Sequence, residues 1–113
     1  MFASLLLPVI AATLVNASQV DSGEFIGKQV SVRGVVSAVV RDDVDDGFNW
    51  IRIKTPEGTV SASTDNKVHP LDELQPLLDA EVELTGVVQR FTQWRKFLGC
   101  LLVIGGRQGL RVT

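Results

Sequence analysis

Val30-Ser-Val-Arg-Gly-Val-Val36 and Val82-Glu-Leu-Thr-Gly-Val-Val88 are the two stretches that decide the fold of this chain. In both, apolar and polar residues alternate, a glycine takes the fifth place, and two valines follow. Alternation with a period of two is typical of a half-buried β-strand. A glycine inside such a strand permits a sharp bend or bulge. The sequence therefore predicts two long strands that bend at Gly34 and Gly86.

The segments around these two stretches predict further strands. Including the two long ones, we expect strands at Lys28–Val40, Phe48–Thr55, Thr59–Ser63, Glu81–Arg90 and Leu98–Ile104, with a short closing strand at Leu110–Val112. The apolar positions of the first strand that we expect to share the inward face are Val30, Val32, Val36, Ala38 and Val40. On the next two strands the alternation directs Ile51, Ile53, Val60 and Ala62 inward.

A short helix is predicted between the third and fourth of these strands. The leucines that recur there at helical spacing are Leu71, Leu74, Leu77 and Leu78. Pro70 suits the start of a helix, whereas Pro76 should shorten or kink it. Three strands, one helix and two strands, with glycines in the first and fourth strands, is the order of a five-stranded Greek-key OB-fold barrel. An SH3-like barrel, the main alternative, does not usually have a helix at that place.

Length and composition limit the class of protein. The 113 residues correspond to one domain, and 45% of them are hydrophobic, which supplies a core. Thirteen acidic residues against eleven basic ones give a net charge of -2, which disfavours a binder of phosphate backbones, although a locally basic face is compatible with it. The single cysteine, Cys100, excludes an internal disulfide and a cysteine-based metal cluster. Within its apolar surroundings we interpret Cys100 as a small buried side chain.

The N-terminus is apolar from Phe2 to Val15. This segment is shorter than the ~20 residues of a membrane-spanning helix, and no transmembrane segment is expected. Its length fits the hydrophobic region of a secretory signal, and Val15-Asn-Ala17 offers a cleavage site after Ala17, although no Lys or Arg precedes the apolar run. We expect residues 1–17 to be a signal peptide and residues 18–113 to be the OB-fold domain, in a periplasmic or secreted protein. The alternative is a segment that stays attached and covers an apolar face, in a cytoplasmic protein.

The segment from Gly27 to Val112 resembles a known family. The stretches that carry the resemblance are Gly27-Lys-Gln-Val-Ser-Val-Arg-Gly-Val-Val36, Arg41-Asp-Asp-Val-Asp45, Asn49-Trp-Ile51, Val82-Glu-Leu-Thr-Gly-Val87, Arg95-Lys-Phe-Leu-Gly99 and Leu110-Arg-Val112. They are similar to OB-fold modules in the extracytoplasmic regions of bacterial sensor histidine kinases. The resemblance implies an extracytoplasmic binding module that is linked to sensing.

Aromatic and basic residues alternate where an OB-fold usually binds its ligand. Its ligand surface is formed by the second and third strands and the adjoining loops. The predicted ligand-binding residues are Phe48, Trp50, Arg52 and Lys54 on the second strand, and Trp94, Arg95 and Lys96 in the loop Phe91–Phe97. Aromatic side chains stack on flat rings, and the basic ones attract anions. Alternatively, Phe48 and Trp50 pack under neighbouring segments, and Arg52 and Lys54 form a solvated row.

Two further groups of polar residues have simpler interpretations. The loop carboxylates Asp42, Asp43, Asp45 and Asp46 lack the spacing of an EF-hand and are interpreted as a solvated acidic turn. His69 is the only histidine, and we expect it to serve a loop or helix cap. No catalytic residue, metal site or cofactor is predicted.

The sequence thus favours a non-enzymatic OB-fold module that binds an oligosaccharide-like ligand or a protein partner. The alternative is a cytoplasmic protein that binds single-stranded nucleic acid through the same residues, which the acidic balance disfavours. Salt dependence separates the two, because only a nucleic-acid complex should weaken steeply with added salt. A third hypothesis is a structural module that docks on a partner through its apolar fifth strand.

Overall fold

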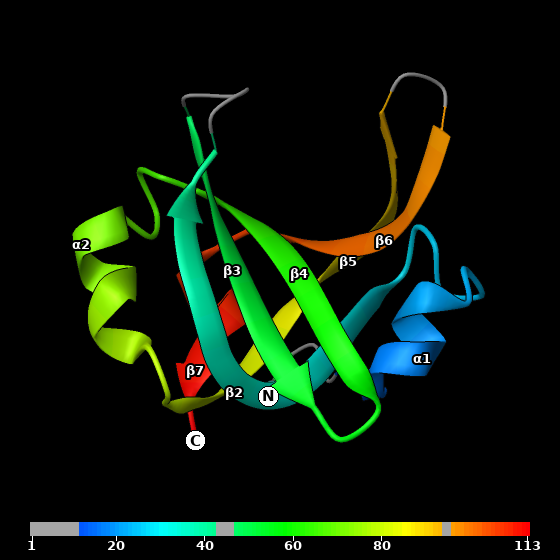
Figure 1. The fold of residues 1–113 in the computed structure, drawn as a ribbon, viewed down its shortest axis with the longest axis horizontal. Helices are drawn as coiled ribbons and strands as arrows, with labels where there is room; N and C mark the ends of the chain where they lie inside the picture. The colour runs from blue at the N-terminus through cyan, green and yellow to red at the C-terminus, as the bar shows by residue number, and fades with distance from the viewer. Residues whose placement is uncertain (1–11, 43–46, 94–95) are drawn as a thin grey trace, which may run out of the picture.

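The computed structural model describes residues 12–42, 47–93 and 96–113, with the backbone alone for residues 92, 93 and 96–98. Its strands are β1 (Thr13–Leu14), β2 (Gln29–Arg41), β3 (Phe48–Thr55), β4 (Gly58–Asp65), β5 (Glu81–Gln93), β6 (Lys96–Ile104) and β7 (Leu110–Val112). The helices are α1 (Ala17–Asp21), α2 (Leu71–Leu74) and the 3-10 turns η2 (Gln75–Leu77) and η3 (Arg107–Gly109). Figure 1 shows β2, β3 and β4 side by side, with α1 and α2 at opposite ends.

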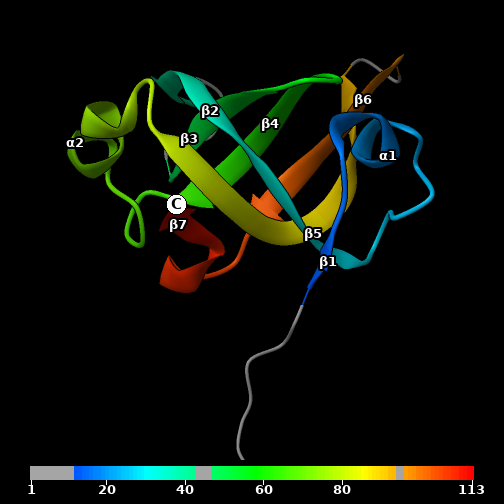
Figure 2. The same ribbon diagram turned by 90° about the horizontal axis from the view of Figure 1, so that it is seen from below.

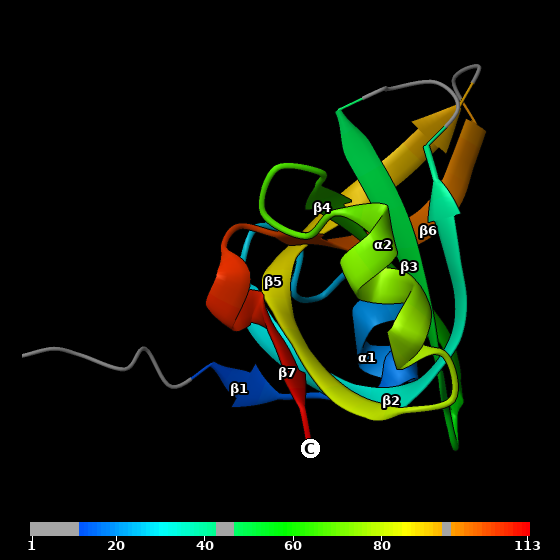
Figure 3. The same ribbon diagram turned by 90° about the vertical axis from the view of Figure 1, so that its left-hand side faces the viewer.

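The five long strands pair in a ring. β2 pairs with β3, β3 with β4, β6 with β5 and β5 with β2, all antiparallel, whereas β4 and β6 run parallel over three residue pairs. Figure 3 looks into this ring. Because the β4–β6 contact is so short, the sheet closes only in part there. The ring has the strand order that the sequence predicted, with a helix between β4 and β5.

The predicted strand number is wrong by two. The sheet has seven strands in the described part of the chain, because β1 and β7 are added to it. β7 is the predicted short closing strand and pairs with β5, whereas β1 pairs in parallel with β2 and was not expected. Each short strand continues a sheet edge that the ring leaves open.

The two motif copies lie against each other in the structure. Val30 pairs with Gly86 and Gly34 with Val82, so the copies run antiparallel and in register. A Cβ atom at Gly34 would lie 2.6 Å from the carbonyl oxygen of Lys54, and one at Gly86 would lie 2.6 Å from that of Val103. Glycine is therefore required at both bends because the next strand approaches too closely for a side chain.

A β-bulge in β2 corrects one of the predicted faces. Val36 pairs with Ile53, but the register then shifts, so that Ala38 pairs with Arg52 and Val40 with Trp50. The extra residue turns Ala38 and Val40 to the outer face, where the Val40 side chain is 55% exposed. The prediction that both face the core is wrong, because alternation is not continuous across a bulge.

The core and its two ends otherwise follow the predicted pattern. Ile51, Ile53, Val60 and Ala62 are buried, as expected. α2 covers one end of the ring with the buried Leu74, and α1 covers the other with Val20 (Figure 3). Pro76 lies in η2, so the predicted helix does shorten to one α-helical turn followed by a 3-10 turn.

The N-terminal residues from Thr13 onward are packed against the sheet. Val15 is buried, and its N–H donates a hydrogen bond to the carbonyl of Ser31 over 2.8 Å. Asn16 forms a capping box with Gln19, and Ala17, the first residue of α1, is buried. The cleavage site expected after Ala17 therefore lies within a packed segment (Figure 2). None of the helices in the described ranges has the length and hydrophobicity needed to cross a bilayer.

The segment predicted as a loop at 91–97 belongs largely to a hairpin. β5 continues to Gln93 and β6 begins at Lys96, with a register shift between Phe91 and Thr92. The hairpin extends beyond the rest of the sheet, on the side of the molecule where α1 lies (Figure 1). The prediction of a loop is wrong because the strand pairing continues past the apolar residues.

Candidate ligand-binding groove

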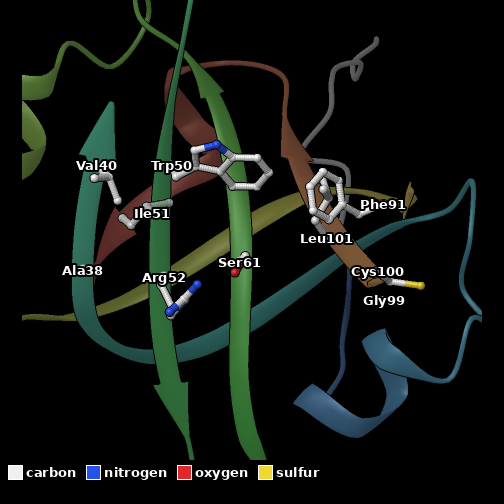
Figure 4. Close-up of a pocket in the computed structure, with 10 residues that line it drawn as sticks. All are labelled: Ala38, Val40, Trp50, Ile51, Arg52, Ser61, Phe91, Gly99, Cys100 and Leu101. Atoms are coloured by element: carbon white, nitrogen blue, oxygen red, sulfur yellow. The ribbon is translucent and has the colours of Figure 1, made fainter. Parts of the chain in front are cut away.

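An open groove of about 450 Å³ crosses the outer side of the sheet (Figure 4). It begins on β2, crosses β3 and β4, and ends at the base of the β5–β6 hairpin. The described residues that line it are Ala38, Val40, Trp50, Ile51, Arg52, Ser61, Phe91, Gly99, Cys100 and Leu101. Most of this surface is apolar, which suits a flat or hydrophobic ligand group.

Two aromatic rings from distant parts of the chain meet in the groove. The ring centroids of Trp50 and Phe91 are 5.7 Å apart, and their planes meet at 66°, an edge-to-face arrangement. In Figure 4 the Trp50 indole reaches across β4 toward Phe91. Phe91 is 37% exposed and Trp50 is half-buried, so both rings are accessible to a ligand.

The hairpin places Phe91 opposite Trp50 through two local irregularities. Phe91 pairs with Gly99, which has a φ of +119°, and the register shift follows directly after Phe91. A positive φ of this size is costly for a residue with a Cβ atom, and a bulge re-aims the side chains beside it. These two features lie at the base of the hairpin, where it bends away from the rest of the sheet, and this base forms one wall of the groove.

Among the described lining residues, Arg52 carries a positive charge. It lies on β3, with Ala38 of β2 and Ser61 of β4 as its direct cross-strand neighbours. Both neighbours are small, and the Arg52 side chain is exposed. Its guanidinium group is therefore available to an anionic group on a ligand that the two rings hold.

The structure gathers some of the predicted site residues and not others. Two of the predicted ligand-binding residues, Trp50 and Arg52, line the groove. Phe48 and Lys54 share their face of β3 but are not among the described lining residues. Trp94 and Arg95 lie outside the described residues, and Lys96 is described only by its backbone at the start of β6. The predictions for these three side chains remain predictions.

Several lining residues were not found by sequence reasoning. Ala38 and Val40 were assigned to the core, and their outward direction follows from the β2 bulge. Ser61, Leu101 and Cys100 reach the groove only because β4 and β6 converge, and no local sequence signal marks that. Phe91 was assigned to the flanking loop, so its place near the site was expected but its strand was not.

Cys100 forms an apolar part of the wall. It is half-buried and packs against the core. Burial, followed by the nearby Asp21 carboxylate, raises the pKa of its thiol. A raised pKa keeps the thiol protonated at neutral pH, which agrees with its interpretation as a small apolar side chain.

His69, which was also singled out from the sequence, is not among the described residues that line the groove. His69 is buried in the loop before α2, where its Nδ1 lies 2.6 Å from Oγ1 of Thr64 and its carbonyl accepts a hydrogen bond from Asn49 over 3.0 Å. It therefore anchors a loop. Asp43, Asp45 and Asp46 lie outside the described residues. Within the described ranges no three His, Cys, Asp or Glu side chains gather as a metal site would require.

Comparison with solved structures gives several matches of similar fold. Over 92% of this chain, asparaginyl-tRNA synthetase from Pyrococcus horikoshii, complexed with asparaginyl-adenylate, matches with a TM-score of 0.67 and 21% identity. Aspartyl-tRNA synthetase from Entamoeba histolytica matches over 91% of this chain with a TM-score of 0.65 and 13% identity. In each case the match covers 22% of the synthetase. This chain thus spans about a fifth of their length.

A smaller protein matches along almost its whole length. The OBody AM2EP06 bound to hen egg-white lysozyme has a TM-score of 0.56 and 13% identity, with 96% of both chains covered. No protein-family model and no curated protein sequence matches this chain. At these identities the similarity shows the fold alone. The chain is a mostly-β protein of OB-like fold, and its outer face carries an aromatic groove.

Proposed function

We propose that this chain is a non-catalytic OB-type binding module whose groove takes single-stranded nucleic acid. The observation that carries the proposal is the Trp50–Phe91 pair with Arg52 beside it. Aromatic side chains stack on nucleobases, and each stacked base contributes roughly 1–3 kcal/mol. Arg52 attracts the phosphate next to the stacked base.

The matched structures support nucleic acid over the oligosaccharide favoured by the sequence. Two of them are named as tRNA synthetases, proteins that by name act on tRNA. The acidic net charge was the main argument against nucleic acid. Net charge describes the whole molecule, whereas the charged side chain among the described groove residues is cationic.

Binding of fluorescein-labelled single-stranded RNA and DNA, followed by anisotropy, tests the proposal. We expect Trp50→Ala to weaken binding at least tenfold because it removes the stacking surface. Phe48→Ala is the matched control, since Phe48 lies on the same face of the same strand but not among the described lining residues. Equal losses in both variants, or none in either, would contradict the proposal. Circular dichroism verifies that each variant is folded.

A protein partner is the second candidate. It is favoured by the OBody, which resembles this chain along its whole length and is named as bound to a protein. In that case labelled oligonucleotides and labelled oligosaccharides both fail to bind, and Trp50→Ala abolishes capture of a specific protein from the host. The anisotropy experiment separates the two candidates directly.

A further inference from the structure

We infer, on the basis of the proposed function, that the groove recognises one base together with one neighbouring phosphate. The ligand class is then an exposed nucleotide at a strand end or an unpaired position, and the described groove residues offer a longer tract no additional contacts. Three features of the groove lead to this inference: its size, the angle between its rings and the position of its charges.

The first feature is the size of the groove. A volume of about 450 Å³ falls in the lower half of the range of roughly 300–1,000 Å³ found for sites that hold one small ligand. One base with its sugar is a ligand of that class. A tract of many nucleotides would have to continue over surface outside the groove.

The second feature is the geometry of the aromatic pair. The planes of Trp50 and Phe91 meet at 66°, so one ring directs its edge at the other. Two successive stacked bases would need two platforms that lie roughly parallel. An edge-to-face pair instead offers one stacking surface and one ring that closes its side.

The third feature is the distribution of charge around the groove. Arg52 is the charged side chain among the described residues that line it. At the hairpin end, Oδ1 of Asp21 lies 3.1 Å from the position of a Cβ atom on Gly99, and Asp65 pairs with Phe48 at the far end of β3. A second or third phosphate would approach these carboxylates, which repel it. Arg90, the cross-strand partner of Cys100, lies at the hairpin end as well, and at Cys100 its charge has a smaller effect than that of Asp21.

Lys54 lies to one side of this path. The groove crosses the strands, whereas Lys54 follows Arg52 along β3, about 7 Å further on at the usual rise per residue. It pairs with Thr59 and is not among the described lining residues. Lys54→Ala is therefore the charge-matched control for Arg52→Ala.

The salt dependence and length dependence of binding follow from one phosphate contact. For single strands the logarithm of the affinity falls by about 0.7 per neutralised phosphate for each tenfold rise in salt. We expect the affinity to fall about fivefold between 50 and 500 mM salt. We divide the affinity for each oligonucleotide by its number of two-nucleotide sites. From a dinucleotide to an octanucleotide this value should change by less than about threefold, because the described groove residues offer further nucleotides no contact.

Titrations of the full chain with fluorescein-labelled di-, tetra- and octaadenylate, followed by anisotropy, test the inference. Arg52→Ala should abolish most of the salt dependence, and Lys54→Ala should leave it unchanged. Two results would overturn the inference but leave the proposed function standing, provided that binding depends on Trp50. The first is an affinity per two-nucleotide site that rises tenfold or more from the dinucleotide to the octanucleotide. The second is an affinity that falls more than a hundredfold between 50 and 500 mM salt. Absence of binding at every length would overturn both the inference and the proposed function.

Discussion

At Gly34 and Gly86 a single methyl group is too large for the fold. In each case the ideal Cβ position lies 2.6 Å from a backbone oxygen of the neighbouring strand. Backbone atoms of a paired strand cannot move aside as the end of a flexible side chain can. These two residues were identified from the alternating pattern around them, and the structure shows the reason for their position.

Gly34→Ala and Gly86→Ala should each lower the free energy of unfolding by about 1–3 kcal/mol, the usual cost of overpacking. Urea unfolding measures the change. Gly105→Ala is the control, since nothing lies within 4 Å of its Cβ position, and its effect should be within about 0.5 kcal/mol. If Gly34→Ala and Gly86→Ala are both as stable as the wild type, the close approach of the neighbouring strand does not constrain the fold.

Glu83 is the centre of a charge triplet on the outer side of β2, β5 and β7. Its carboxylate oxygens lie 2.8 Å from Nε of Arg33 and 3.0 Å from a terminal nitrogen of Arg111. The hydrogen bond from Arg33 is the main cause that lowers the pKa of Glu83 below its ordinary value of 4.5. Because the pKa is lower in the folded state, the interaction stabilises the fold at pH values above 4.5.

Glu83→Gln should therefore destabilise the protein by about 1 kcal/mol at pH 7, because both arginines are largely exposed and surface pairs are weak. The difference from the wild type should shrink as the pH falls below about 4.5, where the wild-type carboxylate becomes protonated. Urea unfolding between pH 7 and pH 3.5 measures this. A difference in unfolding free energy between the two proteins that grows toward acid pH would contradict this prediction. Glu57→Gln, in the exposed turn between β3 and β4, is the control.

Of the predicted ligand-binding residues, Trp50 and Arg52 lie in the groove, and the sequence did not predict where along the strand the groove lies. Alternation along β3 determines which side chains share a face, so Phe48 and Lys54 were included as well. The position of the groove along that face depends on Phe91 and Leu101, which come from β5 and β6. Such contacts between distant segments leave no local signal.

At the scale of elements, irregular strands account for most of the differences between expectation and structure. The β2 bulge reverses the faces of Ala38 and Val40, and the register shift in β5 extends a hairpin where a loop was expected. Bulges insert one residue into an otherwise regular pattern. A periodic pattern therefore predicts that a strand exists better than it predicts the direction of every side chain.

The N-terminal element links the stability of the fold to the predicted signal cleavage. A chain that begins at Ser18 would lose β1, the buried Val15 and Ala17, and the capping residue Asn16. We expect it to be less stable by about 3 kcal/mol than a chain that begins at Ala12, from the burial of Val15 and the loss of the cap. Thermal and urea unfolding of the two chains measure the difference. Equal stability would mean that the segment contributes little to the fold.

N-terminal sequencing of the protein from its host tests the cleavage itself. A start at Ser18 would establish export and would mean that the mature protein folds without β1. An intact start would favour the alternative, in which the apolar segment remains attached to the domain.

At the scale of the whole molecule, the strand order was predictable because each strand is separated from the next by a turn or helix signal. The two motif copies pair with each other as antiparallel neighbours, and each then continues to a different partner: β2 to β3 and β5 to β6. The partial closure at β4 and β6, and the added strands β1 and β7, depend on how the sheet curves. Curvature is a property of the assembled sheet, so the sequence predicted a five-stranded barrel with one short closing strand, whereas the described part of the chain forms a single sheet of seven strands.

Chemical-shift mapping by NMR tests the location of the binding site most directly. On addition of a short single-stranded oligonucleotide, we expect the largest changes at the Trp50 indole N–H and at the amides of Ala38, Arg52 and Ser61. The opposite outer surface, around Arg33, Glu83 and Arg111, should remain unchanged. The largest changes on that opposite surface, with none at Trp50, would contradict the account.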